Sequence, residues 1–323
     1  MANMSTREQR LARQDILRGV SEAQHAVVNR RQLYDAGITR WQVGAELRAR
    51  RWRQHGRQTV ALHTGPLDRT AVMWRAVFET GADSALDGVS ALMMRGLEHF
   101  ETDVVHVSVS KGTRYRRARG VRVHETRRRR PSDMPEASAP VVRADVATLR
   151  AALWAATDRQ AAFVIVLAVQ QGLTTPGALF ESFASIRRDK RRTLIKRLLE
   201  DVAGGVQSMG ELDFARACRR RGLPPPTRQA LRRMPNGRAY LDVYWDQFRI
   251  VVEIEGFHHL LPGVAIADSL RQNQLTLDRD RVLRIPVLGL RVAEAAFLDQ
   301  VEELLRRHGW QGPPRPHDNP LAS

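Results

Sequence analysis

The sequence predicts an α/β protein in which helical stretches and short strands alternate along the chain. Residues 29–48 have the spacing of two short helices joined by a turn. Valines alternate with polar residues over 105–110 and again over 121–124, and a second pair of strands is expected over 239–255. The residues between these strand regions form apolar runs that are typical of helices. We therefore expect strand-containing domains on either side of a helical connector.

Changes in residue pattern along the 323 residues predict several domains. A stretch rich in Pro, Ser and Ala over 132–140 has the composition of a linker. We expect a helix-turn-helix module over 1–65, a small α+β domain over 66–130, a helical connector over 131–205, an α/β domain over 206–310 and a disordered tail over 311–323.

The charge of the chain is strongly positive. It holds 52 Lys and Arg residues against 35 Asp and Glu, a formal net charge of +17, and nearly all of the cations are Arg. A guanidinium binds phosphate oxygens through paired hydrogen bonds, and a positive field concentrates polyanions near the protein. We predict that the partner is DNA, although a genome rich in G and C would also raise the Arg content.

Cysteine usage and hydropathy exclude several classes of protein. Cys218 is the only cysteine, so neither an intramolecular disulfide nor a Cys-rich zinc site can form. The first residues lack the apolar core of a signal peptide, and the longest apolar run, 161–169, is far shorter than the roughly 20 residues that span a bilayer. We expect a cytoplasmic protein with no membrane partner and no disulfide-linked partner.

Residues 26–62 have the layout of a winged helix-turn-helix. A helix over 29–36 ends at Gly37, and Thr39 is a good N-cap for a second helix. The basic segment that follows, over 51–62, is expected to form a short hairpin. A generic small helical subdomain would show the same layout.

In a winged helix the start of the second helix enters the major groove of DNA. Arg40 and Gln42 are therefore expected to face bases, and Arg51 and Arg53 to contact phosphates.

Three acidic residues gather on the expected strand pair over 239–255: Asp242, Glu253 and Glu255. If the turn is a two-residue hairpin at Asp246-Gln247, Asp242 pairs with Val251 and is the diagonal neighbour of Glu253. All three carboxylates then lie on one face of the hairpin. Like charges this close are unfavourable, and a hard divalent cation bound by carboxylate oxygens removes the conflict. An exposed polar face is the alternative.

A helix upstream of these strands supplies another acidic residue. Ser208 is a plausible N-cap, and Glu211 either completes its capping box or adds a fourth carboxylate to the site.

These motifs resemble a known superfamily. Asp242 followed by Glu253-Ile254-Glu255 is similar to the PD-(D/E)XK nuclease signature. The region 206–290 resembles the very-short-patch-repair-like endonuclease domain in the order of its motifs: Ser208 with Glu211, GLPPPTRQ at 222–229, Asp242, EIEGFHH at 253–259, Asp268 with Arg271, and VLR at 282–284. More loosely, the first 200 residues resemble a winged helix followed by an AbiEi-antitoxin-like domain.

The resemblance implies a restriction-endonuclease-like α/β/α core with a mixed sheet, and metal-dependent hydrolysis of phosphodiester bonds. It assigns Mg²⁺ or Mn²⁺ to Asp242, Glu253 and Glu255, with Glu211 and His259 (or His258) as further catalytic residues. Arg271 and Arg284 would contact DNA or stabilise charge on the phosphate. In the superfamily signature a Lys stands where this chain has Glu255.

Two other functions stay open. An antitoxin-type transcriptional regulator with a catalytically inactive nuclease fold would also combine a winged helix with this domain. A nuclease acting on RNA is a third possibility, because Arg contacts to the backbone do not distinguish the sugars. Cutting of both strands would usually need two such sites, which a homodimer would supply.

Overall fold

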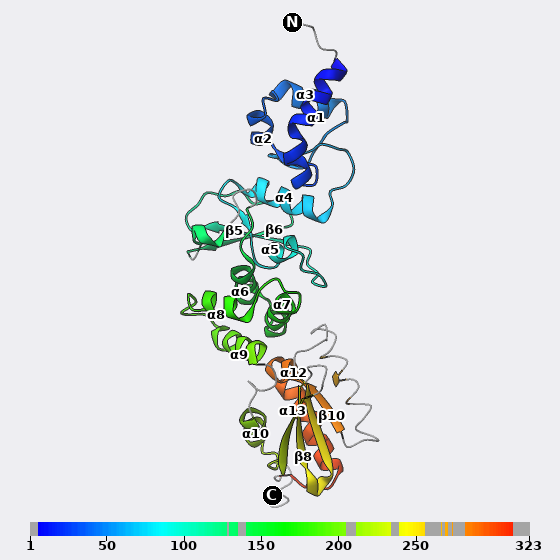
Figure 1. Ribbon diagram of the computed structural model, residues 1–323, viewed down its shortest axis with the longest axis vertical. Coiled ribbons are helices and arrows are strands. Elements are labelled where there is room, and N and C mark those ends of the chain that lie inside the picture. The colour runs from blue at the N-terminus through cyan, green and yellow to red at the C-terminus, as the bar shows by residue number, and fades with distance from the viewer. Residues whose placement is uncertain are drawn as a thin grey trace, which may run out of the picture. The chain divides into compact units, whose positions relative to one another are not determined.

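The computed structural model shows a mixed α/β protein with three small sheets (Figure 1). It describes residues 6–127, 129–134, 140–204, 211–233, 239–255, 266, 269, 270, 273 and 282–312. The chain divides into two compact units, Met1–Ala147 and Thr148–Ser323. No helix in these described ranges is both long and apolar enough to cross a membrane.

The first unit begins with the two helices and the hairpin that the sequence predicts. The elements are α1 (Thr6–Ala23), β1 (Val27–Asn29), α2 (Arg30–Asp35), α3 (Arg40–Arg48), β2 (Arg53–Gln54) and β3 (Thr59–Ala61). The three strands form an antiparallel sheet in the order β1-β3-β2. Both short helices start at capping boxes, Asn29 with Gln32 and Thr39 with Gln42.

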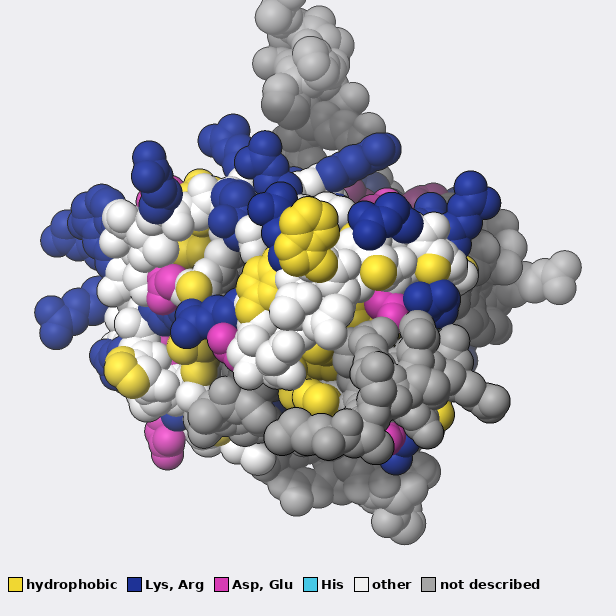
Figure 2. Space-filling model, turned by 90° about the horizontal axis from the view of Figure 1, so that it is seen from above, with side chains coloured by type: hydrophobic (Ala, Val, Ile, Leu, Met, Phe, Trp, Pro, Cys, Tyr) yellow, Lys and Arg dark blue, Asp and Glu magenta, His cyan; other side chains and the backbone are white. Residues whose placement is uncertain are grey.

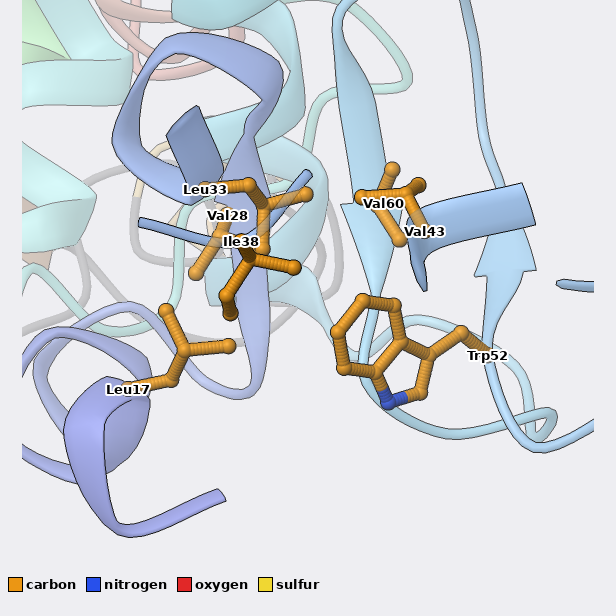
Figure 3. Close-up of a cluster of buried hydrophobic side chains, with 7 residues drawn as sticks. All are labelled: Leu17, Val28, Leu33, Ile38, Val43, Trp52 and Val60. Atoms are coloured by element: carbon orange, nitrogen blue, oxygen red, sulfur yellow. The ribbon is translucent and has the colours of Figure 1, made fainter. Parts of the chain in front are cut away.

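These elements enclose a small apolar core (Figure 3). It contains Leu17, Val28, Leu33, Ile38, Val43, Trp52 and Val60, each at most 5% exposed. Its side chains come from all of these elements except β2, with Trp52 from just before that strand. Short helices are marginal by themselves, so this shared core stabilises α2 and α3 in place.

The rest of the first unit is built around α4 and a second sheet. Its elements are α4 (Arg69–Thr80), β4 (Ala85–Leu86), α5 (Gly88–Met94), β5 (Val105–Ser110), β6 (Val121–Thr126) and the 3₁₀ turn η1 (Pro131–Asp133). The sheet order is β4-β5-β6, with β5 and β6 parallel. Val27 and Ala61 pack in one cluster with Ala71 and Trp74 of α4, so the boundary predicted at residue 65 lies inside a continuous core.

Glu79, near the end of α4, binds the turn between β2 and β3. Its carboxylate accepts hydrogen bonds from the backbone N–H groups of Arg57 (2.9 Å), Gln58 (2.8 Å) and Thr59 (2.9 Å), and from the Thr59 hydroxyl (2.8 Å). A Cβ at Gly56 would overlap this carboxylate, so only glycine fits there. Glu79 is buried, and its four bonds fix the turn against α4.

β5 and β6 carry two stacked histidines. His106 Nδ1 lies 2.9 Å from His124 Nε2, and the ring centroids are 5.1 Å apart with an interplanar angle of 14°. Burial and then nearby Arg122 lower the pKa of His106 to about 4. Burial, followed by His106 and Arg122, lowers the pKa of His124 to about 3. Both rings therefore stay neutral at neutral pH.

The second unit combines a helical layer with a four-stranded sheet. Its helices are the end of α6 (Ala144–Trp154), α7 (Asp158–Gln170), α8 (Pro176–Phe183), α9 (Arg192–Gly204), α10 (Glu211–Arg220), α12 (Val287–Val292) and α13 (Glu294–Arg307). Its strands are β7 (Arg228–Arg233), β8 (Ala239–Trp245), β9 (Ile250–Glu255) and β10 (Val282–Pro286), in the order β10-β9-β8-β7. β9 is antiparallel to β8 and parallel to β10.

The predicted connector helices belong to this unit. α9 packs on α7 and α8, and its Asp201 is 1% exposed. Asp201 accepts two hydrogen bonds from Arg291 of α12, at 2.7 and 2.9 Å. Such a paired, buried ion pair costs several kcal/mol to break from one side, so it holds α9 to α12.

One face of the four-stranded sheet is apolar and buried. Val243, Trp245, Ile250, Val252, Ile254, Leu283 and Ile285 are each at most 1% exposed. The rings of Phe214 on α10 and Trp245 meet edge to face, with their centroids 6.4 Å apart. Helix α13 packs against β9. Because side chains alternate along a strand, the remaining positions of β8, β9 and β10 lie on the opposite face.

Replacing Glu79 with Ala is expected to lower the free energy of unfolding of the first unit by about 2–4 kcal/mol, because three backbone N–H groups and a hydroxyl lose their acceptor. Chemical denaturation followed by circular dichroism measures the loss, and amide exchange over 57–59 should accelerate. Glu98→Ala, at a side chain that is 78% exposed, is the control and should change stability by less than about 0.5 kcal/mol. Equal stability of the two variants would contradict the role of Glu79.

Acid is expected to destabilise the first unit through the histidine pair. An unfolded histidine has a pKa near 6.5, above the folded values, so protons bind preferentially to the unfolded chain. Above pH 6.5 the histidine pair makes its full contribution to the free energy of unfolding. This contribution decreases as the pH falls toward 4, by about 1–2 kcal/mol per histidine between pH 7 and 5 after solvent screening. Unfolding measured across this range should show a shallower pH dependence in His106→Asn/His124→Asn than in the unchanged protein, and an equal dependence in the two proteins would contradict the role of the pair.

Candidate functional site

The connection between β8 and β9 is longer than the sequence suggested. Residues Asp246–Phe248 form the 3₁₀ turn η3, and Arg249 follows in a left-handed conformation at φ +56°. The two-residue turn predicted at Asp246-Gln247 is therefore wrong, and Trp245 pairs with Ile250. The pairing is shifted by two residues from the one we expected.

This shift brings the acidic positions closer together. Asp242 pairs directly with Glu253 instead of Val251, and Tyr240 pairs with Glu255. Directly opposed residues share a face of the sheet and have Cβ atoms about 4.5–5.5 Å apart, compared with roughly 7–8 Å between diagonal neighbours. The positions of Asp242, Glu253 and Glu255 thus lie on the face opposite the buried apolar side chains.

An arginine completes this row. Arg284 of β10 pairs with Glu253 in the parallel ladder, and its Nε lies 3.1 Å from Glu253 Oε2. The Glu253 side chain is 20% exposed and the Arg284 side chain 57% exposed. The row therefore runs Asp242, Glu253, Arg284 across three strands, with a cation beside the acidic pair.

Asn273 fixes Arg284 from the edge of the sheet. Its side-chain amide donates to the Arg284 carbonyl (2.8 Å) and accepts from the Arg284 N–H (3.0 Å), as a neighbouring strand would. Asn273 is 3% exposed and also donates to Gln300 of α13 (3.1 Å), whose amide donates to the Leu270 carbonyl (2.8 Å). Sequence reasoning missed this residue, since one Asn in the polar run RQNQ carries no signal of a buried contact.

Several predicted site residues lie wholly or partly outside the described residues. The backbone of Glu211 is described, as the first residue of α10, and Asp242 and Glu255 are placed by their strand positions. The side chains of these three are outside, as are all of His258, His259, Asp268 and Arg271. Among the side chains that are described, no group of three or more His, Cys, Asp or Glu could hold a metal ion.

Cys218 has no catalytic environment. It is fully buried on α10 with Phe214, and this burial raises the pKa of its thiol to about 12. The thiol is therefore protonated and unreactive at neutral pH, and its role is one of packing.

A second candidate site lies on α3 and the hairpin of the first unit. Arg40 is exposed as the first residue of α3, as predicted. The Gln42 side-chain oxygen accepts a hydrogen bond from the Thr39 N–H at 2.8 Å and completes the capping box. This bond holds the Gln42 side chain at the start of α3, and its contact with a base stays a prediction.

The hairpin arginines differ from each other. Arg51 Nε lies 2.5 Å from Oε2 of buried Glu46, and the hydrogen bond to Glu46 raises the pKa of Arg51. Arg53 is exposed and makes one long hydrogen bond, 3.4 Å, to the Thr64 carbonyl. Arg53 is therefore more available for a phosphate than Arg51, which is held by Glu46.

Sequence reasoning missed Trp41 on α3. Its side chain is 82% exposed, the highest value among the large hydrophobic residues that are described as exposed. The spacing of Trp41, Ala45 and Arg48 puts them on one face of α3, opposite buried Val43. The sequence did contain a sign of it, because Trp41 does not share the helix face of the apolar residues Val43 and Leu47.

Cations surround exposed apolar side chains on the face of the molecule drawn in Figure 2. The exposed arginines of α3 and the hairpin are Arg40, Arg48, Arg50, Arg51, Arg53 and Arg57. A convex helix face with an exposed aromatic residue and a border of arginines has the chemistry to contact nucleic acid.

No protein-family model matches the chain, and no curated protein matches it either.

Proposed function

We propose that this protein is a DNA-binding, metal-dependent endonuclease that hydrolyses phosphodiester bonds. The observation that carries the proposal is the direct pairing of Asp242 with Glu253, with Glu255 two residues further on the same face. Three carboxylates without a metal would repel each other, and Arg284 is the one cation among the residues that the described ladders pair with them.

The order of elements supports a restriction-endonuclease-like core. α10, β7, β8 and β9 are followed by helical residues at 266, 269, 270 and 273, and then by β10. This order agrees with the motif order of the very-short-patch-repair-like domain, in which an Asp strand and a Glu-x-Asp/Glu strand precede a helix and a final strand. The first unit would correspond to the winged helix and the AbiEi-antitoxin-like region.

The donor set fits Mg²⁺ or Mn²⁺, which prefer carboxylate oxygens. Asp242, Glu253 and Glu255 would hold the ion. When bound, such an ion supplies charge stabilisation at the phosphoryl group and lowers the pKa of water. Glu253 also accepts a hydrogen bond from Arg284, so a bound ion would lie beside a cation.

The remaining residues would move protons and hold the phosphate. A carboxylate oxygen of Glu255 or Glu211 would accept the proton of the attacking water, and the imidazole of His259 would give a proton to the leaving oxygen. The Arg284 guanidinium is more than half exposed and would bind a non-bridging phosphate oxygen. Arg271 would contact the DNA backbone.

The first unit would supply DNA affinity. Arg40, Trp41 and Arg48 on α3 would enter the major groove, and Arg53 on the hairpin would contact phosphate. Arg51, already paired with Glu46, would contribute less.

One observation favours the second candidate, a DNA-binding regulator with an inactive nuclease fold. The Arg284–Glu253 ion pair already neutralises one of the acidic residues, and Glu255 stands where the superfamily signature has Lys. A protein of this kind would bind DNA without any need for metal.

Asp242→Asn is expected to lower plasmid cleavage by more than about 100-fold, because loss of a metal ligand exceeds the effect of losing a supporting residue. Purified protein is incubated with supercoiled plasmid and Mg²⁺ or Mn²⁺, and nicked and linear products are measured, with EDTA as the metal-free arm. Asp246→Asn, on the exposed turn of the same hairpin, is the matched control and should cleave at the original rate.

Cleavage that persists in Asp242→Asn would overturn the assignment. Absence of cleavage by the unchanged protein, together with retained DNA binding, would favour the regulator or a substrate that ordinary plasmid does not contain.

Arg53→Gln is expected to weaken binding to duplex DNA and to reduce the slope of log affinity against log salt by about 0.9, the contribution of one phosphate contact. Fluorescence anisotropy at several salt concentrations measures both quantities. Arg187→Gln removes the same charge at an exposed position of the second unit and should leave the slope unchanged. Equal slopes for both variants would remove the hairpin from the DNA interface.

A further inference from the structure

The connection between β5 and β6 carries a concentrated positive charge that the proposed function does not use. Residues 111–122, which run from this connection into β6, include six Lys and Arg and no Asp or Glu. Over 111–120 every exposed residue is Lys, Arg or Gly: Lys111, Gly112, Arg114, Arg116, Arg117, Arg119 and Gly120. A surface of this composition attracts polyanions.

Hydrogen bonds hold the connection in place. The Lys111 N–H donates to the Thr126 carbonyl at 3.0 Å, beside the end of β6. The Thr113 hydroxyl donates to the carboxylate of Asp83, also at 3.0 Å. The cations of the connection are therefore carried on a fixed backbone, which loses less conformational entropy on binding than a mobile basic tail would.

One arginine of the connection has a structural role. The Arg116 N–H donates to the Thr80 carbonyl (3.0 Å), and its guanidinium donates to the carbonyls of Glu79 (3.0 Å) and Phe78 (3.4 Å). These carbonyls belong to the last turn of α4, where a helix leaves its acceptors without partners and a cation commonly satisfies them. Arg116 thus joins the connection to α4.

The neighbouring arginines have no such role. Within the part of the chain that the structure describes, no hydrogen bond or ion pair engages the guanidinium groups of Arg114, Arg117 and Arg119. Exposed arginines of the second unit have acidic partners, as Arg220 has in Glu294 at 3.1 Å. Cations gathered without acidic neighbours repel each other, and an anionic partner offsets this repulsion.

The basic surface continues onto the helix-turn-helix. Arg31 of α2 borders the same cavity as Arg114, so the two residues lie close together on the first unit. The Arg31 side chain is 84% exposed, and its 3.6 Å contact with Asp35 is a weak surface pair. In helix-turn-helix proteins the first helix crosses the DNA backbone while the second enters the major groove. The DNA backbone that crosses α2 would therefore continue toward Arg114.

The chemistry of the connection favours nucleic acid over an anionic membrane. Five of its six cations over 111–122 are Arg, and a guanidinium matches the oxygens of a phosphate through paired hydrogen bonds. A segment that lies on a membrane also inserts apolar side chains, and the exposed residues over 111–120 include none.

We propose that the β5–β6 connection is a second contact surface for duplex DNA. Arg114, Arg117 and Arg119 bind phosphates beyond those that α3 and the hairpin contact. Phosphate contacts fix the position of a protein on the duplex without reading its sequence, so this surface adds affinity and leaves base recognition to α3. The inference rests on the DNA binding proposed above and not on the cleavage reaction.

The variant Arg114→Gln/Arg117→Gln/Arg119→Gln of the full chain tests the proposal. Fluorescence anisotropy measures binding to a labelled DNA duplex at several salt concentrations, in EDTA so that no cleavage occurs. We expect the slope of log affinity against log salt to fall by about 2–3, and the affinity at roughly 0.1 M salt to fall by about 30-fold or more, because each phosphate contact contributes about 0.9 to the slope. The loss should be equal on two duplexes of unrelated sequence.

The matched control is Arg187→Gln/Lys190→Gln/Arg197→Gln, which removes the same charge from exposed positions of the second unit. It should bind DNA within about twofold of the unchanged protein and keep its slope. An equal loss in the two triple variants would show that only net charge matters and would overturn the proposal. A larger loss on duplex RNA of the same length would also overturn it, as would lost binding to phosphatidylserine vesicles with unchanged binding to DNA.

The comparison with Arg53→Gln separates this inference from the proposed function. Weaker binding in Arg53→Gln with unchanged binding in the triple variant of the connection would retain the hairpin interface and remove the second surface. Absence of DNA binding by the unchanged protein would remove both. The three arginines of the connection are exposed, so their variant is expected to fold like the unchanged protein, which circular dichroism checks.

Discussion

The four-stranded sheet of the second unit must keep one face away from water, and this requirement decides where its charged residues lie. Ile250, Val252 and Ile254 fill the buried face, so the alternate positions of β9, including Glu253 and Glu255, are forced onto the other. The partners in β8 and β10 follow by register, which brings Asp242 and Arg284 to either side of Glu253. Burial of the apolar face thus gathers acidic residues, which repel each other, on the opposite face. We propose that a bound divalent cation offsets this repulsion.

The first unit meets a similar constraint with backbone groups instead of a metal. The turn between β2 and β3 directs three N–H groups at one point, and the Glu79 carboxylate satisfies them. Its negative charge lies within a strongly basic part of the chain, and the arginines nearest in sequence to the turn are left exposed. Because this carboxylate binds backbone groups of the turn, Arg53 and Arg57 remain exposed at the surface of the hairpin.

Local features of the fold could be predicted from the sequence, and tertiary features could not. The cap at Thr39 is a local hydrogen bond, so residue type and spacing were enough to find the start of α3. The predicted partner of Asp242 was wrong because the strand pairing depends on the left-handed conformation of Arg249. This conformation is uncommon for residues other than glycine, so the sequence gives no sign of it. The contacts of Asn273 depend on residues far apart in the chain. For the candidate site, the sequence was enough to name the acidic residues. The spacing between them depends on the strand register, which only the structure shows.

The position of Glu79 also limits how this protein can be rearranged by recombination. A helix outside the helix-turn-helix supplies the anion on which the hairpin turn closes, and Ala71 and Trp74 of the same helix complete the core beneath β1 and β3. A segment that ended near residue 65 would lose both supports. A recombination that preserves the fold of the helix-turn-helix must therefore carry α4 with it, so the smallest unit that can be exchanged extends well beyond residue 65.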